Sequence, residues 1–203
     1  YTVSMTNTAD PRKYQYFAKL DWPRVSHPAL RFPVDVAPDG EQATMLAHVY
    51  EYDVILLGPG QTTPAPWINV VANPDFGFQV AAEGSGYTWS LNSRENQLTP
   101  WSNDPVSDPS GEAIYIRDDD SEEVWSPTAL PIRNDPAPYV ACHGQGYSRF
   151  HHGSHGILVE LLQFVPSEDP IKISRLTLQN ASGRSRRLSI TAYAEWVLGS
   201  TRS

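Results

Sequence analysis

Aromatic and planar polar side chains are concentrated between Glu83 and Asp104. This stretch holds two tryptophans, a tyrosine, an Arg-Glu-Asn triplet and a closing Asn-Asp-Pro, but few aliphatic residues. Aromatic rings cover the C–H faces of a pyranose, and Arg, Glu, Asn and Asp side chains pair with its hydroxyl groups. The composition therefore favours contact with a sugar, and a wet surface loop pinned by its tryptophans is the alternative that stays open.

Three other arrangements that could do chemistry lack the required context. Gly58-Pro59-Gly60 does not lie between a strand and a helix, and its proline removes an N–H that a phosphate-binding loop needs. The chain contains no Gly-x-Ser-x-Gly nucleophile elbow. Cys142 and His143 are adjacent, so in a strand they point to opposite faces, and we predict a structural cysteine.

Histidines and acidic residues form two clusters with a superficial likeness to metal sites. His143, His151, His152 and His155 fall within thirteen residues, but Gly153 disfavours the helix that a zinc pair would need. We interpret them as polar residues that line a groove. The acidic run 118–123 lacks the glycine and the ligand spacing of a calcium loop, so we predict a solvated turn. Neither a metal nor a cofactor is predicted.

Glycosidic chemistry requires a carboxylic acid with a raised pKa at a fixed place in a pocket, and usually a second carboxylate. The sequence singles out no such pair, so no catalytic residue is predicted. The carboxylates considered are Glu83, Glu95, Asp104, Asp108, Glu112 and Glu160.

Composition narrows the class of protein. A chain of 203 residues fits one large domain or two small ones. Its formal charge of −8 argues against a nucleic-acid partner, which would require a basic patch. The single cysteine excludes an internal disulfide and fits a reducing compartment. No apolar run approaches the ~20 residues that a membrane span needs.

The hydrophobic pattern predicts an all-β fold. Prolines and glycines separate short segments, and no stretch keeps a helical period over three turns. Residues 76–82 and 87–91 alternate around Gly84-Ser85-Gly86, which is typical of a hairpin. Residues 157–165 are expected to form a core strand, with a short helix as the alternative. We predict a large antiparallel β-sandwich over residues 51–203 and a peripheral arm over residues 1–50.

The C-terminal part carries three further expectations. Residues 171–180 change phase, which a β-bulge near Ser174-Arg175 would explain. Residues 180–184 are then a hairpin turn. The alternating run 188–198 is expected to turn its apolar side, which includes Trp196, toward the core.

Five segments, in this order, resemble one family: the phosphorylase-like part of cyclic β-1,2-glucan synthases, related to the cellobiose and chitobiose phosphorylases of glycoside hydrolase family 94. The resemblance covers roughly Leu56 to Gly199. The segments are NPDFGFQVAAEGSGYTWSLNSRENQLTPWSNDP, GEAIYIRDDDSEEVWSPTALPI, HGQGYSRF, DPIKISRLTLQN and RRLSITAYAEWVLG.

This resemblance implies a galactose-mutarotase-like β-sandwich, called a supersandwich, that precedes a helical (α/α)6 barrel. In the family the barrel carries the catalytic general acid, and inorganic phosphate is the nucleophile of an inverting reaction. The resemblance therefore implies an incomplete sandwich, truncated at its C-terminal end, with no turnover of its own. Since the chain begins at Tyr1 rather than Met, we expect a piece of a longer protein.

In the family, loops of the sandwich approach the sugar site of the barrel. The resemblance therefore assigns Trp89 and Trp101 as stacking platforms. Arg94 and Glu95 could instead pair with each other and hold the loop. Trp125 is expected to be a core anchor. The hydroxyl partners that the resemblance implies are Arg94, Glu95, Asn96, Asn103 and Asp104, with Gln145 and Arg149 as second choices.

One position departs from the family pattern. Cys142 stands where an arginine is expected before the His-Gly of the third segment. If that arginine faces the active site, this chain lacks one charged contact with sugar or phosphate.

The expected function is that of a non-catalytic carbohydrate-binding and scaffold domain, with a β-glucan oligosaccharide and the barrel as partners. Two alternatives remain open. One is a self-contained mutarotase-like epimerase, in which His143 or His152 acts with Glu160 as acid and base. The other is a purely structural packing domain. An uncovered sheet edge further predicts self-association. The resemblance places the parent protein at a bacterial inner membrane, with this part on the cytoplasmic side.

Overall fold

A computed structural model describes residues 45–49, 52–102, 104, 106–133 and 137–200. The chain divides into two units, residues 1–43 and 44–203, and all the described residues lie in the second. Residues 45–49 form the first strand. The remainder of the predicted N-terminal arm lies outside the described residues.

The described residues form twelve strands and no helix, which confirms the predicted all-β class. Residues 157–164 are a strand and not the alternative short helix. In chain order the strands are β1 (Met45–Val49), β2 (Tyr52–Leu57), β3 (Ile68–Ala72), β4 (Phe76–Ala81), β5 (Gly86–Ser90), β6 (Glu112–Asp118), β7 (Val124–Trp125), β8 (Tyr139–Gly144), β9 (Tyr147–Ser154), β10 (Ile157–Phe164), β11 (Ile173–Asn180) and β12 (Leu188–Ala194).

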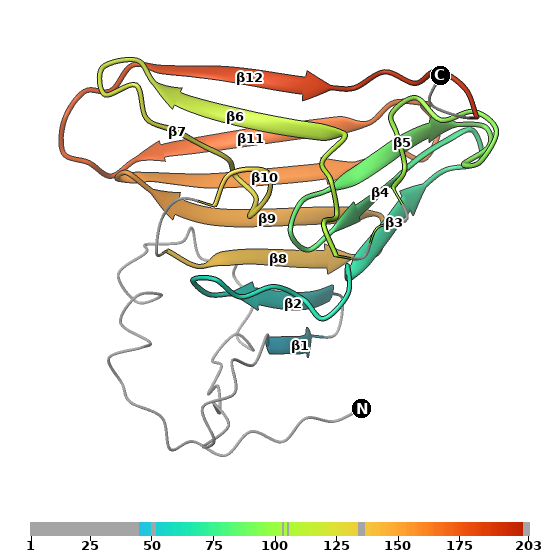
Figure 1. The fold of residues 1–203 in the computed structure, drawn as a ribbon, viewed down its shortest axis with the longest axis horizontal. Coiled ribbons are helices and arrows are strands. Elements are labelled where there is room, and N and C mark those ends of the chain that lie inside the picture. Colours follow the sequence, from blue (N-terminus) through green and yellow to red (C-terminus); the bar gives the residue numbers. More distant parts are fainter. Residues whose placement is uncertain (1–44, 50–51, 103, 105, 134–136, 201–203) are drawn as a thin grey trace. The chain divides into compact units, whose positions relative to one another are not determined.

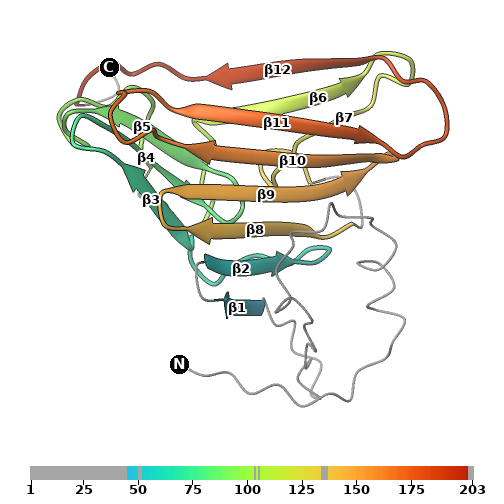
Figure 2. The same cartoon turned by 180° about the vertical axis from the view of Figure 1, so that it is seen from behind.

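The strands assemble into one large sheet and two small ones (Figure 1). The large sheet has the order β1-β2-β8-β9-β10-β11, with every neighbouring pair antiparallel. The small sheets have the orders β12-β6-β7 and β3-β4-β5. Both small sheets lie over the same face of the large sheet, and the view from behind leaves the opposite face in front (Figure 2). This arrangement confirms the predicted β-sandwich.

The core lies between the large sheet and the two small ones. Alternate residues of β9 and β10 point into it, for example Phe150 and Val159, and the residues between them are only half-buried. This is the pattern expected of strands with one covered face. Trp125 is completely buried, as predicted. The buried hydrophobic residues form two clusters: Ile55, Leu57, Val71, Phe78, Val80, Ala82, Ala129, Tyr139, Ala141, Phe150 and Leu161 in one, and Ile116, Trp125, Ile157 and Val159 in the other.

The predicted hairpin of β4 and β5 is present, with Phe78 opposite Thr88. Its turn needs Gly84, because φ there is +101° and an added Cβ would lie 2.3 Å from Thr128. Leu91 was expected to share the face of Tyr87 and Trp89, and this expectation is wrong. Leu91 follows the end of β5, adopts φ +61° and is exposed.

The expectation of a buried apolar side for residues 188–198 is also wrong. β12 ends at Ala194, and among the described residues it is an edge strand that pairs with β6 alone. Ile190 is exposed, and Trp196 is 66% exposed. Alternation shows which side chains share a face, but it does not show whether another element covers that face.

Two expectations about β11 are corrected by its pairing. β10 and β11 are paired one to one from Ile157↔Asn180 to Phe164↔Ile173, so the strand has no bulge. Leu176 and Leu178 pack against the core, and Ile173 lies opposite Phe164 on the other face. The change of phase therefore arises because both faces of the large sheet carry apolar residues. Residues 180–184 are not a hairpin turn, since β11 and β12 belong to different sheets.

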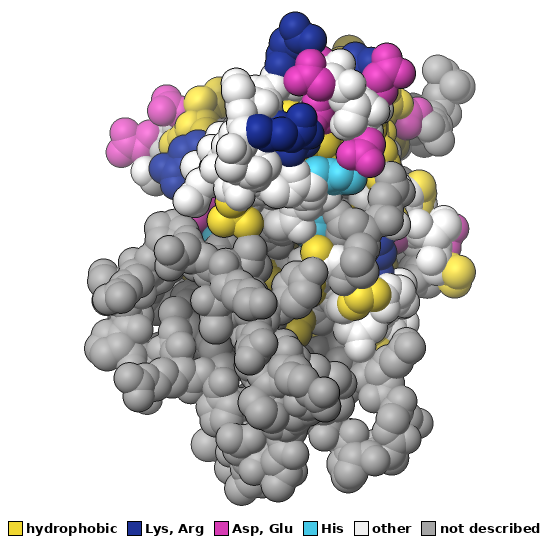
Figure 3. Space-filling view, turned by 90° about the vertical axis from the view of Figure 1, so that its left-hand side faces the viewer, with side chains coloured by type: hydrophobic (Ala, Val, Ile, Leu, Met, Phe, Trp, Pro, Cys, Tyr) yellow, Lys and Arg dark blue, Asp and Glu magenta, His cyan; other side chains and the backbone are white. Residues whose placement is uncertain are grey.

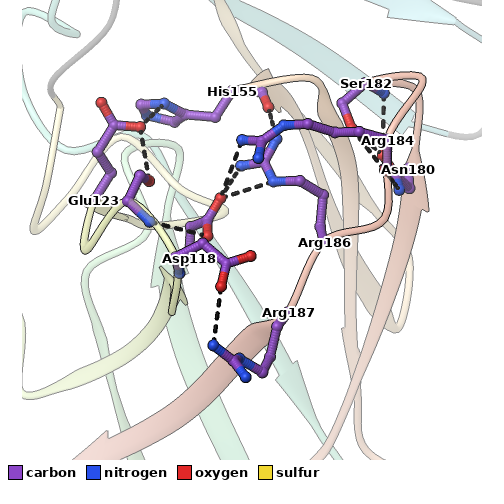
Figure 4. Close-up of polar contacts among 10 residues, drawn as sticks. Asp118, Glu123, His155, Asn180, Ser182, Arg184, Arg186 and Arg187 are labelled. Carbon is purple, nitrogen blue, oxygen red and sulfur yellow. Dashed lines mark hydrogen bonds and ion pairs between the residues drawn. The ribbon is translucent and has the colours of Figure 1, made fainter.

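Three connections meet at the end of the sandwich where β6 ends and β12 begins, and we call residues 118–123, 155 and 184–187 the charged end. Figure 3 faces this end and shows basic and acidic side chains interspersed. Asp118 and Arg186 are 0% and 4% exposed and form an ion pair, drawn in Figure 4. The prediction of a solvated acidic turn is therefore wrong for Asp118, which is buried and paired. The local sequence does not reveal this pair, because Arg186 lies 68 residues further along the chain.

The same arginine joins the charged end to the large sheet. Its Nη1 donates to the carbonyl oxygen of His155 in the β9–β10 turn at 2.6 Å. The His155 Nδ1 lies 2.7 Å from Glu123, and its ring packs 4.8 Å from that of Trp125. Hydrogen bonds to the Asp118 carboxylate from the Asp120 N–H and from Arg186, together with the Arg186 charge, outweigh burial and lower the pKa of Asp118. A fully buried, ionised carboxylate thus holds two sheets together.

Candidate functional site

A row of three aromatic rings runs along β5 and the segment that follows it. The Tyr87 ring centroid lies 5.2 Å from that of Trp89 and 6.2 Å from that of Trp101. Trp89 covers Gly77 of β4 so closely that a Cβ there would lie 2.5 Å from the indole. Trp89 is therefore half-buried and occupied on one face, whereas Trp101 is 50% exposed. Of the two predicted stacking platforms, Trp101 offers more free surface.

We call residues 91–104 the aromatic loop. Asn92 shapes its first turn, because its side-chain oxygen accepts hydrogen bonds from the N–H groups of Arg94 and Glu95, each at 2.9 Å. The Arg94 and Glu95 side chains form the ion pair that was left open as an alternative, at 3.4 Å, but they are 90% and 65% exposed. Such an exposed pair contributes little to stability, so both groups are free to contact a ligand.

Backbone pairing ties the loop to the small sheet and to the end of the described chain. The N–H of Leu98 donates to the carbonyl of Thr88 at 2.8 Å. Gln97 exchanges two backbone hydrogen bonds with Gly199, at 3.0 and 2.9 Å. The half-buried Asn96 is part of the same pairing, since the N–H of Ser90 donates to its carbonyl at 3.1 Å. The loop therefore presents its exposed side chains from a paired backbone.

Asp104, at the end of the aromatic loop, already forms hydrogen bonds to the residues that follow it. The Asp104 carboxylate accepts hydrogen bonds from the N–H groups of Val106 and Ser107, at 2.9 and 3.1 Å, and from the Ser107 hydroxyl. The Ser107 hydroxyl and then the two backbone bonds lower the pKa of Asp104. Asn103 lies outside the described residues.

The second-choice residues lie away from the aromatic loop. Gln145 is exposed in the β8–β9 turn, which Asn69 of β3 holds by donating to the carbonyls of Gly144 and Tyr147 at 2.9 Å each. The turn therefore lies at the β3 edge of the small sheet and the aromatic loop at its β5 edge, on the order of 10 Å apart by strand spacing. Arg149 lies on β9 between the inward-pointing Ser148 and Phe150, so it belongs to the opposite face of the large sheet.

The acid–base pair of the epimerase alternative is not assembled. The Glu160 carboxylate lies on the outer face of the large sheet. Its oxygens are 3.9 Å from Nδ1 of His151, 4.0 Å from Nε of Arg149 and 3.6 Å from Nη2 of Arg175. His143 and His152 are buried on its inner face. The His143 Nδ1 lies 3.0 Å from the Ser148 hydroxyl, and the His152 ring stacks on Tyr139 at 3.7 Å.

Burial determines the chemical state of three of these groups. It lowers the pKa of both His143 and His151 to about 4, so both imidazoles are neutral at pH 7. It raises the pKa of the Cys142 thiol to about 11, which opposes formation of a thiolate nucleophile. Cys142 lies opposite Arg149 in the pairing of β8 and β9, so the expected arginine would stand beside another arginine.

Other carboxylates considered for glycosidic chemistry mostly have structural partners. Glu83 pairs with Arg133 at 3.1 Å. Burial, with a smaller contribution from the charge of Asp104, raises the pKa of Asp108, which is the direction that a general acid requires. Among the described residues, no group of three or more His, Cys, Asp and Glu side chains is arranged to hold a metal ion.

Sequence reasoning missed one group of residues that shapes the site. Glu112 of β6 accepts hydrogen bonds from Thr88 of β5 and Thr99 of the aromatic loop, and it pairs with Lys172 before β11. No local pattern reveals this group, because Lys172 is 60 residues from Glu112.

Comparison with known proteins identifies the class. Residues 51–203 match the model of the glycosyl hydrolase 94 supersandwich domain, so the chain belongs to this family, as its motifs indicate. No helix among the described residues is long and apolar enough to cross a membrane.

Individual relatives place the chain within that family. Over 153 residues, 75% of the chain, it is 48% identical to the cyclic beta-(1,2)-glucan synthase NdvB of Rhizobium meliloti (strain 1021), and it covers 5% of that protein. Over 142 residues, 69% of the chain, it is 29% identical to the N,N'-diacetylchitobiose phosphorylase of Vibrio proteolyticus, and it covers 18% of it. Over 141 residues, 68% of the chain, it is 28% identical to the solabiose phosphorylase of Paenibacillus borealis, again covering 18%. The chain thus spans less than a fifth of each of these relatives.

Proposed function

We propose that this chain is a non-catalytic, sugar-contacting domain of a cyclic β-1,2-glucan synthase or a related β-glucan phosphorylase. The substrate class follows from the similarity to NdvB, whose name specifies a cyclic beta-(1,2)-glucan. The domain contributes loops to a sugar site that a helical barrel of the parent protein completes. In this proposal inorganic phosphate is a substrate of the parent enzyme, and the domain itself uses no cofactor.

The observation that carries the proposal is the position of Trp101. A half-exposed tryptophan, which packs beside Tyr87 of β5 and lies on a loop with a paired backbone, offers a flat surface to a pyranose ring. Arg94 and Glu95, which are highly exposed on the same loop, supply hydrogen-bonding groups for hydroxyls. The β8–β9 turn with Gln145 lies at the other edge of the same small sheet, which favours an oligosaccharide over a single sugar.

The parent protein's placement is part of the same proposal. In this proposal the domain lies on the cytoplasmic side of a bacterial inner-membrane protein and packs against the barrel, as the resemblance to cyclic β-1,2-glucan synthases implies. Affinity of this domain alone is expected to be weak, in the millimolar range, because half of the site lies on the barrel.

The test is a titration of the domain with linear β-1,2-glucooligosaccharides, followed by amide and indole NMR. Shifts confined to residues 91–104 and the β8–β9 turn are expected. Trp101→Ala should abolish them. Trp196→Ala is the matched control, because Trp196 is also exposed but lies outside the loop. An absence of shifts at millimolar sugar, or equal responses of the two variants, would contradict sugar contact by this loop.

A second candidate, a domain that acts only by packing, has a specific observation in its favour. Several large apolar side chains in β12 and in the residues that follow it are exposed: Ile190, Tyr193, Trp196 and Leu198. A concentration of exposed apolar groups in one segment is typical of a region that another protein element covers. This candidate predicts no sugar-induced shift in wild-type protein, so the same titration separates the two.

A further inference from the structure

One carboxylate lies at the centre of the connections that hold the aromatic loop. The Oε1 of Glu112 accepts a hydrogen bond from the Thr88 hydroxyl at 2.5 Å and from the Thr99 hydroxyl at 2.6 Å. Its Oε2 pairs with the Nζ of Lys172. The Glu112 and Lys172 side chains are mostly buried. A buried charged pair of this kind is costly to break, because the remaining charge loses its partner.

The hydroxyl of Thr99 has a defined direction in this arrangement. It accepts a hydrogen bond from the N–H of Thr88 at 2.8 Å, so its own proton is directed to the Glu112 carboxylate. Burial alone would raise the pKa of Glu112, but the charge of Lys172 and the hydrogen bonds from Lys172, Thr88 and Thr99 outweigh it and lower that pKa. The carboxylate is therefore an ionised acceptor at neutral pH.

The carboxylate is itself fixed from the opposite side. Lys172, in the connection between β10 and β11, lies with its Nζ 4.4 Å from the ring centroid of Phe78, which is fully buried in the core. One residue before Glu112, Gly111 packs on Pro100, and a Cβ at Gly111 would lie 2.9 Å from the proline ring. Thr99 and Pro100, the two residues before Trp101, are thus both held against the start of β6.

From this geometry we infer that Glu112 is a positioning residue that sets the orientation of Trp101 for ligand contact. The inference rests on the proposed function for the identity of the ligand. The orientation of Trp101 itself can be tested without any ligand. Glu112 touches no ligand in this proposal. It acts through Thr99, and Lys172 connects that contact to the core between the sheets.

The experiment compares Thr99→Val and Glu112→Gln with the matched control Thr99→Ser, which keeps the hydroxyl. Backbone amide spectra first verify that the sheets of each variant are intact. The relaxation of the Trp101 indole N–H and its quenching by acrylamide then report on orientation without any sugar. A titration with linear β-1,2-glucooligosaccharide reports on binding.

Thr99→Val and Glu112→Gln are expected to increase the mobility and quenching of Trp101 and to weaken glucan binding about fivefold, the equivalent of one hydrogen bond. Thr99→Ser should match the wild type. Unchanged Trp101 signals in both variants would overturn the inference. If the wild type binds no glucan while the two variants loosen Trp101, the positioning role stands and the proposed function fails.

Discussion

Asp118 and Arg186 at the charged end are 0% and 4% exposed, whereas Arg94 and Glu95 in the aromatic loop are 90% and 65% exposed. Both are pairs of opposite charge at or beyond the ends of strands. The first is removed from water and also bonded to backbone groups of two connections, so it closes the sandwich. The second is solvated, and its loop is held by other residues. Burial, and not the pairing of charges as such, therefore distinguishes a structural contact from an available one.

The largest expected effect comes from breaking the buried pair. Arg186→Ala leaves Asp118 buried without its main partner, so we expect the melting temperature to fall on the order of 10 °C. Arg187→Ala is the matched control: Arg187 is the next residue and also pairs with acidic groups, but it is 74% exposed. Its melting temperature should change by less than about 2 °C in thermal unfolding followed by circular dichroism. Equal decreases would refute the role assigned to burial.

Acid unfolding should separate the neutral buried groups from the ionised ones. The pKa of His143 and of His151 falls from 6.5 to about 4 on folding, so the unfolded chain takes up protons first, and stability is lost as the pH drops from about 6.5 to 4. Each histidine should account for on the order of 3 kcal/mol. The pKa of Asp118 and of Glu112 is lowered on folding, so for them too the unfolded chain takes up protons first, and their contribution is lost as the pH falls below their ordinary pKa values of 3.8 and 4.5.

Urea unfolding at a series of pH values measures both phases. His143→Gln and His151→Gln should flatten the first phase, and Asp118→Asn should remove part of the second. A stability profile that is level between pH 6.5 and 4 in the wild type would contradict the neutral, buried state of these histidines.

Self-association is expected to depend on the exposed apolar residues after β12, Trp196 and Leu198, and not on the charged residue Arg187 before it. Trp196→Ser with Leu198→Ser removes two exposed apolar side chains, and we expect the association constant to fall about tenfold. Arg187→Ser, at the other end of the strand, should leave it unchanged. Light scattering after size exclusion measures both. A wild-type monomer at high concentration would refute the prediction of self-association.

The smallest effect on stability is expected at the exposed pair. Arg94→Ala should change the free energy of unfolding by no more than about 0.5 kcal/mol, because both side chains are solvated. The same substitution is expected to weaken glucan binding about two- to fivefold. Chemical denaturation and the sugar titration measure the two quantities, and a marked loss of stability would show that this pair does hold the loop.

Much of the fold could be predicted because it depends on short-range patterns. The hairpin of β4 and β5 follows from alternation around Gly84-Ser85-Gly86, and residues 157–164 were predicted as a strand from their apolar content. The family was predicted from ordered motifs and is confirmed by the match over residues 51–203. The roles of the predicted sugar-contacting residues stay a prediction, although the structure groups five of them at or after the end of β5: Trp89, Arg94, Glu95, Asn96 and Trp101.

The errors have a common physical cause, which is that contacts between distant segments cannot be read from one strand. The apolar pattern predicted a strand correctly over 188–194, but residues 195–198 are not part of it, and no other described strand lies beyond β12. The phase change in β11 indicated a bulge because one face was assumed to be polar. Arg149 was grouped with the loop by motif, yet its place on β9 puts it on the opposite face of the large sheet.

Patterns within the sequence were sufficient to predict a β-sandwich of the glycosyl hydrolase 94 supersandwich family, and they place aromatic and planar polar residues together in one stretch. Alternation, turn residues and motif order are local properties, so they are present in the unfolded chain. The contact of Asp118 with Arg186, and the way Glu112 joins Thr99 to Lys172, follow only from the folded arrangement of the sheets. Those contacts span up to 68 residues, and they arise only when the sheets pack and remove the charges from water.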